Sequence, residues 1–200
     1  MKRPTLSRSL KVLGPLAAAL SLTVAAASPA SANPSIATRQ GSEVQWTAFS
    51  NEDNRLSVFN NGGVLNLQDT DGILPGPNCT AVNPTLVTCG PTAGTTRLRL
   101  SSGDWNDLVS VDAALTIPAD VDGGAGQDVI IGGAGADRLR DPDGWPTPPM
   151  GATFAAGAGN DQVVSWNGGY DVVDCGPGFD TAVVDRFRDT VYNCEYVIRY

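Results

Sequence analysis

Aspartates follow glycine-rich turns at a nearly regular spacing in the second half of the chain. The stretch GGAGQD (residues 123–128) is followed nine residues later by GGAGAD (132–137), and imperfect copies end at Asp161, Asp171 and Asp180. Glycine permits tight turns and close approach of the backbone to a ligand, so carbonyl oxygens can point inward beside each carboxylate. Calcium accepts six to eight such oxygens in flexible geometry, whereas magnesium demands stricter geometry and keeps its waters. The pattern therefore predicts a calcium site.

The residues that follow these aspartates are typical of short strands. Val129-Ile130-Ile131, Gln162-Val163-Val164 and Thr181-Ala182-Val183 are β-prone and have an apolar middle position. A turn and a short strand repeated every nine residues stack into a parallel β-roll, in which two repeats make one coil and the turns align in two columns. No helical stripe of apolar residues is evident, so the chain is predicted to be all-β.

Residues 33–119 are expected to form an N-terminal β region of short strands that continues into the β-roll. Two strand-like runs, Arg55–Phe59 and Val64–Leu67, flank the turn residues NNGG, which predicts a hairpin. The run 96–100 alternates polar and apolar residues, as a strand with one buried face does. Residues 120–200 are expected to form the β-roll (a β-solenoid), closed by a disulfide-linked C-terminal cap.

The turn-and-strand units resemble the RTX repeat, also called the haemolysin-type calcium-binding repeat, with its pattern Gly-Gly-x-Gly-x-Asp-x-apolar-x. The resemblance covers residues 120–185; two adjacent copies match every fixed position and the others match in part. The C-terminal segment is also similar to that of small secreted bacterial proteins with these repeats. The resemblance implies that the turn aspartates and backbone carbonyls of the turns bind calcium. Carried over, the ligands are Gly123, Ala125, Asp128, Gly132, Ala134, Asp137, Ala156, Ala158, Asp161, Asp171 and Asp180.

A proline-rich segment, residues 141–155, interrupts the repeats. In the family, an ion is shared by repeats two apart. If the segment bulges from one coil, Asp128 stacks near Asp161, Asp137 near Asp171, and Asp161 near Asp180. If it breaks the stack, the first two repeats lack partners. Asp171 has a displaced glycine pair and is the least regular ligand, and residues 103–107 look like a degraded upstream relative.

Three other interpretations of the glycine-rich segment fit less well. A flexible linker favours Gly and Ser without a period, whereas Asp and apolar residues here stay in phase. A phosphate-binding loop needs Gly-Lys-Ser/Thr, and no lysine follows residue 11. An EF-hand starting at Asp120 would place Ile131 where glutamate is required.

The first 32 residues are typical of a signal peptide. A basic start precedes an apolar run and Ala30-Ser31-Ala32, which suits signal peptidase; the alternative is an uncleaved anchor, although the run is short for a span of about 20 residues. Four of the 13 basic residues and none of the 21 acidic ones lie there, so the remainder carries 9 − 21 = −12 charges. That charge disfavours nucleic acid and attracts divalent cations. We expect a secreted protein without a membrane span.

The cysteines predict disulfides, because an even number in a secreted chain usually pairs. Three pairings are open for Cys79, Cys89, Cys175 and Cys194, of which the local one, 79–89 and 175–194, is the simplest. Zinc is disfavoured, because there is no Cys-x-x-Cys spacing and no histidine.

Catalysis is not expected. The absence of histidine removes Ser-His-Asp, Cys-His and zinc-protease machinery, and a hydrolase with a carboxylate pair is the least favoured alternative. We expect calcium to stabilise the roll for an extracellular structural or binding role. The alternative is a surface adhesin or glycan-binding module, which would use the tryptophans. Core or loop packing is the more usual role of tryptophan, and Trp145, in the proline-rich segment, is the best candidate for exposure. The tryptophans are Trp46, Trp105, Trp145 and Trp166.

Overall fold

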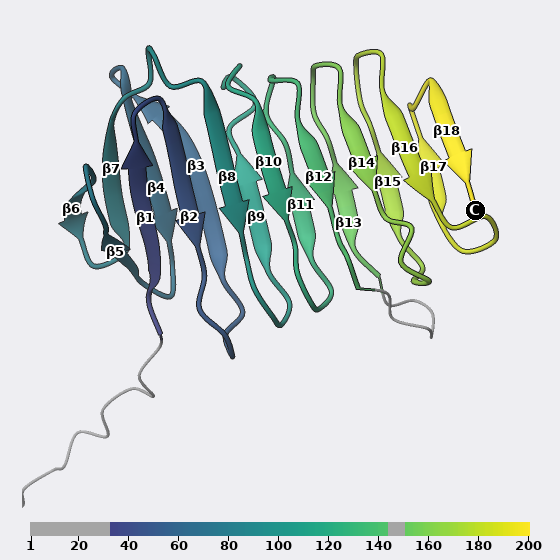
Figure 1. Ribbon diagram of the computed structural model, residues 1–200, viewed down its shortest axis with the longest axis horizontal. Coiled ribbons are helices and arrows are strands. Elements are labelled where there is room, and N and C mark those ends of the chain that lie inside the picture. Colours follow the sequence, from purple (N-terminus) through teal and green to yellow (C-terminus); the bar gives the residue numbers. More distant parts are fainter. Residues whose placement is uncertain (1–32, 144–150) are drawn as a thin grey trace, which may run out of the picture. The chain divides into compact units, whose positions relative to one another are not determined.

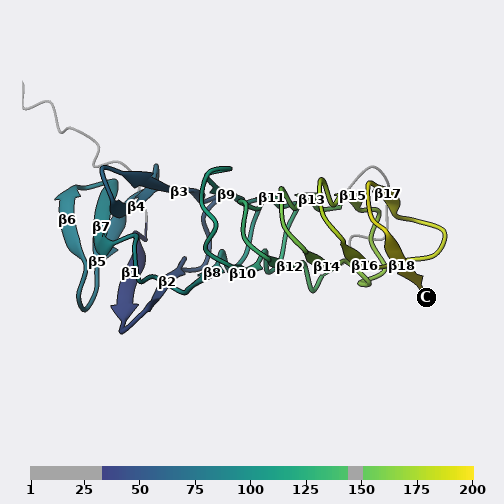
Figure 2. The ribbon, with the colours of Figure 1, turned by 90° about the horizontal axis from the view of Figure 1, so that it is seen from above.

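The computed structural model describes residues 33–143 and 151–200 (Figure 1). The predicted signal peptide and Trp145 lie outside these residues. Within them the regular structure is entirely β, as the sequence predicts, with 18 strands in two nine-stranded mixed sheets. Seen from above, the strands of the two sheets lie in two facing rows (Figure 2).

The first sheet contains one antiparallel pair, β1–β2, and the strands on either side of this pair are joined to it in parallel. Its spatial order is β18 (Tyr196–Arg199), β16 (Thr181–Val184), β14 (Gln162–Val164), β12 (Arg138–Arg140), β10 (Ala119–Asp122), β8 (Arg97–Ser101), β2 (Glu43–Thr47), β1 (Ser35–Gln40) and β5 (Ile73–Pro75).

The second sheet is parallel from β17 to β3 and antiparallel beyond it. Its spatial order is β17 (Thr190–Tyr192), β15 (Val172–Asp174), β13 (Thr153–Ala155), β11 (Val129–Ile131), β9 (Leu108–Val111), β3 (Arg55–Asn61), β4 (Val64–Asp69), β7 (Leu86–Pro91) and β6 (Thr80–Asn83).

From β8 onward, successive strands alternate between the two sheets. Each pairs in parallel with the strand two further along the chain, so that Val129 lies opposite Thr153, and Arg138 lies opposite Gln162. The same parallel pairing joins β2 to β8 and β3 to β9, upstream of residue 120. Every turn of this region is therefore placed beside the turn two strands later.

The core lies between the sheets and takes one residue from the middle of each short strand. Ile130, Leu139, Phe154, Val163 and Val173 are at most 1% exposed, whereas the residues before them in each strand face outward. This is the apolar middle position predicted from the sequence. Burial of a full aliphatic side chain contributes about 1.5–3 kcal/mol, so each three-residue strand is held mainly by one side chain.

The predicted hairpin is confirmed at β3 and β4, where Asn61 lies opposite Val64. Gly62 and Gly63 form its two-residue loop with φ of 60° and 85°, which matches the turn that suits the right-handed twist of paired strands.

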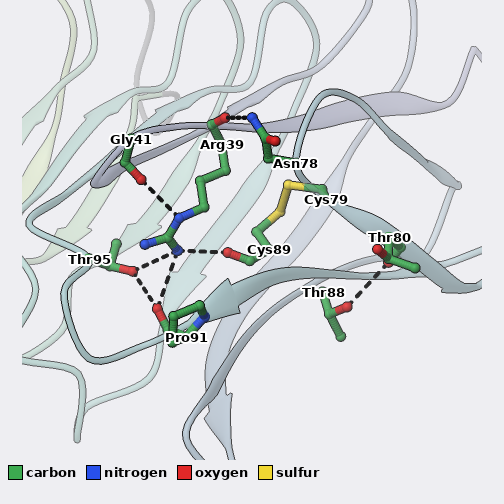
Figure 3. The surroundings of a disulfide bond; sticks show 9 residues. All are labelled: Arg39, Gly41, Asn78, Cys79, Thr80, Thr88, Cys89, Pro91 and Thr95. Atoms are coloured by element: carbon green, nitrogen blue, oxygen red, sulfur yellow. Dashed lines mark hydrogen bonds between the residues drawn. A yellow bond between two sulfur atoms is a disulfide. The ribbon is translucent and has the colours of Figure 1, made fainter.

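Two disulfides join neighbouring cysteines, in the local pairing: Cys79–Cys89 and Cys175–Cys194. Beside the first, the Arg39 guanidinium donates to the carbonyl oxygens of Cys89 and Pro91, at 2.7 and 3.2 Å (Figure 3). The Arg39 carbonyl accepts from the side chain of Asn78, at 2.9 Å. These bonds tie β1 to the segments on both sides of the disulfide.

Candidate metal centre

The turns that precede the parallel strands form two columns. Turns of the first column lead into the second sheet, and turns of the second column lead into the first sheet. The first column consists of turns ending at Asp107, Asp128, Ala152, Asp171 and Asp189, and the second of turns ending at Asp137, Asp161, Asp180 and Glu195.

This stacking corrects part of the predicted pairing. Asp161 does stack on Asp180, as expected, but Asp137 stacks on Asp161 and not on Asp171, and Asp128 does not stack on Asp161. The reason is an additional turn-and-strand unit inside the supposed interruption. Its strand is β13, and Ala152 stands where the other repeats have aspartate. Asp171 consequently lies in the first column, between Ala152 and Asp189.

One carboxylate oxygen of each turn aspartate is used to fix the backbone of the coil before it. In the second column, Oδ1 of Asp161 accepts from the N–H of Asp137 at 2.8 Å, and Oδ1 of Asp180 accepts from the N–H of Asp161 at 2.7 Å. In the first, the N–H of Asp107 donates to Oδ1 of Asp128 at 2.9 Å. Ala152 and Asp171 donate in the same way to the next coil.

The other oxygen of most turn aspartates is buried and has no hydrogen-bond partner within the part of the chain that the structure describes. The side chains concerned are at most 3% exposed. A buried polar atom without a partner costs free energy, and it calls for a ligand when the same atom recurs in a column. The unpartnered atoms are Oδ2 of Asp107, Asp128, Asp161, Asp171 and Asp180.

Burial is the main cause of a raised pKa at these carboxyl groups, because it disfavours the charged form. The pKa of Asp107 rises to about 8, those of Asp128 and Asp171 to about 7, and those of Asp137 and Asp161 to about 6. A divalent cation would reverse this shift by stabilising the ionised form.

The glycines of the repeat allow consecutive turns to touch. A Cβ on Gly124 would clash with the carbonyl oxygen of Gly103, and a Cβ on Gly157 with that of Gly133. The same two carbonyls accept from the N–H groups of Ala125 and Ala158, both at 2.9 Å. Turn-to-turn contact is therefore made by the backbone.

The predicted carbonyl ligands occupy the first and third positions of these stacked turns. The Gly123 carbonyl already accepts from the Ser102 hydroxyl at 2.7 Å, and the Ala156 carbonyl lies directly against Gly132. The predicted residues in these positions are Gly123, Ala125, Gly132, Ala134, Ala156 and Ala158.

Several acidic residues in or beside the columns are absent from the predicted ligand set, among them Asp107, Asp141, Asp189 and Glu195. Asp189 accepts from the N–H of Asp171 at 3.0 Å, and Glu195 from that of Asp180 at 2.9 Å. Asp189 follows Asp180 by the repeat length of nine residues, and this spacing could have identified it as a turn aspartate. No glycine lies between the two residues. In the sequence, Asp107 belongs to a segment that resembles the repeat only in degraded form.

The oxygen atoms of the turns suit a hard cation that is coordinated by only one or two carboxylates. In residues 33–143 and 151–200, no three acidic, histidine or cysteine side chains group closely enough to hold an ion by themselves. A cation in a column would therefore take one or two carboxylates and complete its coordination with carbonyl oxygens and water, which calcium accepts. The unpartnered Oδ2 atoms supply the carboxylate part of such a site.

The described tryptophans have different surroundings. Trp46 is fully buried and donates to the Ser35 hydroxyl at 2.8 Å, so it belongs to the core. Trp105 and Trp166 are more than half exposed, and Trp166 stacks on Tyr200 with ring centroids 4.6 Å apart.

Comparison with protein-family models, curated proteins and solved structures finds no match to this chain. Among the residues that the structure describes, none form a helix that is long and apolar enough to span a membrane.

Proposed function

We propose that the parallel region is a calcium-binding β-roll of a secreted protein, and that calcium stabilises it for an extracellular structural or binding role. The observation that carries the proposal is the repeated unpartnered Oδ2 atom on buried turn aspartates, among them Asp128, Asp161 and Asp171. The two disulfides support an extracellular location, since such bonds persist in oxidising compartments.

The two oxygens of a turn aspartate with an unpartnered Oδ2 have different tasks in this proposal, whereas Oδ2 of Asp137 already accepts from the N–H of Gly133. Oδ1 positions the backbone of the preceding coil, as Asp161 does for Asp137. Oδ2 binds the cation, together with carbonyl oxygens of the adjacent turns. Bound calcium supplies positive charge that offsets the repulsion between stacked carboxylates. Because the unfolded chain has no stacked turns, binding free energy adds to folding free energy.

Calcium titration of the metal-free protein tests this proposal. Extracellular calcium sites often have a Kd of about 10⁻⁴–10⁻³ M, so about 5 mM calcium should contribute on the order of 1–2 kcal/mol per site. We expect the melting temperature to rise by about 5 °C or more, and magnesium to give a much smaller rise. An unchanged melting curve and circular dichroism spectrum up to about 10 mM calcium would exclude the proposal.

Asp161→Asn separates the two tasks of the turn aspartate. Asparagine keeps an oxygen that can accept from the N–H of Asp137, but it removes the charge that the cation requires. We expect the variant to fold and to show a smaller calcium-induced rise in melting temperature. Asp71→Asn is the matched control, because Asp71 is exposed and lies outside both columns. Equal calcium responses of the two variants would argue against Asp161 as a ligand.

A glycan-binding module remains a second candidate, supported by the exposed Trp166–Tyr200 pair. Exposed aromatic faces can stack on sugar rings, but they also occur on surfaces without ligands. A glycan array probed in calcium with wild type and Trp166→Ala tests it. Binding that disappears in the variant would support the module, and a flat array with the wild type would reject it.

A further inference from the structure

The turn that lacks the repeat aspartate begins with two acidic residues. In the first column, the unit ending at Ala152 starts at Asp141-Pro142-Asp143, where intact repeats have a glycine pair. The N–H of Gly123 donates to the Arg140 carbonyl, and the N–H of Asp141 donates to the Val164 carbonyl. Asp141 therefore stands one coil after Gly123, in the first position of its turn.

Asp141 is buried, and one of its carboxylate oxygens has no partner. The side chain is only 2% exposed. Oδ1 accepts from the N–H of Asp143 at 3.2 Å, while Oδ2 accepts no hydrogen bond among residues 33–143 and 151–200. The nearby cation, Arg140, is paired with Asp122 on the outer face of the sheet. A carboxylate in this position needs a positive partner if it is ionised.

A second unpartnered oxygen, Oδ2 of Asp128, lies in the turn of the neighbouring coil. This atom lies against Gly123, where a Cβ would be 2.5 Å away, and Gly123 is the neighbour of Asp141 in the adjacent coil. Asp143 links the two turns, because its Oδ1 accepts from the N–H of Gly126 at 3.3 Å.

We propose that Asp128 and Asp141 hold one divalent cation between neighbouring coils, with calcium as the ion that suits two carboxylates and carbonyl oxygens. The inference rests on the calcium-binding function proposed above and extends it to a turn that does not match the repeat. The carboxylate that is missing at Ala152 is replaced by one at the start of the same turn. The interrupted unit therefore keeps a cation site of its own.

Counting bound calcium in wild type and Asp141→Asn tests this inference. Asparagine retains an acceptor for the N–H of Asp143, so the turn can keep its hydrogen bond. Equilibrium dialysis at saturating calcium should show one ion per chain fewer in the variant, together with a smaller calcium-induced rise in melting temperature. Asp71→Asn should bind as many ions as the wild type.

The outcomes separate this inference from the function on which it rests. If the wild type binds no calcium, both are overturned. If the wild type binds calcium and Asp141→Asn binds the same number of ions with the same gain in melting temperature, only the Asp128–Asp141 site is rejected.

A measurement on the wild type covers the case in which the variant fails to fold. Anomalous diffraction from crystals grown in calcium should place an ion between the side chains of Asp128 and Asp141. Ions elsewhere in the columns, with none between these two side chains, would overturn the site.

Discussion

The turn aspartates combine a backbone contact with a buried charge. In Asp161, one oxygen holds the N–H of the previous coil while the other is enclosed without a partner. Removal of a carboxylate from water is costly unless charge and hydrogen bonds compensate for it. In Asp161 only the first oxygen is compensated by the protein itself, and this asymmetry makes such aspartates responsive to protons and cations.

The stability of the metal-free protein should depend on pH in an unusual direction for aspartates. The pKa of Asp137 and Asp161 is about 6 and that of Asp107 about 8 in the folded protein, above the ordinary value of 3.8. The folded state therefore binds more protons than the unfolded state, so the free energy of unfolding falls as the pH rises from about 4 to about 8. Thermal melts of the metal-free protein across this range should show decreasing melting temperatures.

Calcium should reverse this trend, since it competes with protons for the same carboxylates. The calcium-induced gain in melting temperature should be small near pH 5 and larger near pH 8. A metal-free protein that becomes more stable between these values would show that the aspartates are ionised and compensated without a cation.

The turn-and-strand unit depends on its neighbours. A three-residue strand buries one central side chain, such as Phe154 in β13, and its turn contacts the next turn through glycines. A unit of this length cannot bury an apolar face alone, so stability comes from stacking. For this reason β13 still joins the second sheet, although Ala152 replaces the repeat aspartate before it.

Two glycine substitutions distinguish turn stacking from backbone strain. Gly94 and Gly157 have similar φ values, 85° and 97°, but a Cβ on Gly94 meets open space, whereas one on Gly157 would clash with the Gly133 carbonyl. Gly94→Ala should lose about 1–2 kcal/mol from strain alone. Gly157→Ala should lose about 1–3 kcal/mol more. Denaturant unfolding measures the free energy of unfolding of both variants. Equal decreases in this free energy would mean that neighbouring coils can separate at little cost.

At the scale of residues 33–200, the described strands surround one core, and a disulfide lies near each edge of the sheets. Cys79–Cys89 joins the residue before β6 to β7, near the β5–β6 edge. Cys175–Cys194 joins turns near the β17–β18 edge. Each bond of this kind typically stabilises by about 2–4 kcal/mol. Between them, the stacked turns concentrate negative charge in a chain that carries −8 overall and −12 without its first 32 residues.

Screening of the protein's negative charge by salt should be distinguishable from specific binding of calcium. Raising sodium chloride from about 0.01 to 0.1 M shortens the screening length from about 30 to 10 Å, which relieves long-range repulsion but leaves adjacent buried carboxylates unpaired. We expect a small rise in melting temperature with sodium chloride. A larger rise is expected with calcium chloride at equal ionic strength. Equal rises would assign the whole effect to screening.

The local features of this protein can be predicted from its amino-acid sequence. The period of nine, the apolar middle residue of each strand and the NNGG hairpin follow from short-range backbone and burial preferences, and the structure confirms the all-β fold, the buried middle positions and the hairpin. The prediction of calcium ligands among Asp128, Asp137, Asp161, Asp171 and Asp180 also comes from local pattern, and it stays a prediction.

Which turns are neighbours follows from strand pairing in the folded chain and could not be predicted from the sequence. The strand β13 has Ala152 before it in place of an aspartate, so the repeat pattern does not reveal this unit. The turn pairings predicted across residues 141–155 were therefore wrong by one column. Strand register depends on hydrogen bonds between segments far apart in the chain, and one extra unit moves a turn to the opposite sheet. For the same reason Asp141, outside the repeat pattern in sequence, lies next to Gly123, the first residue of the turn that ends at Asp128.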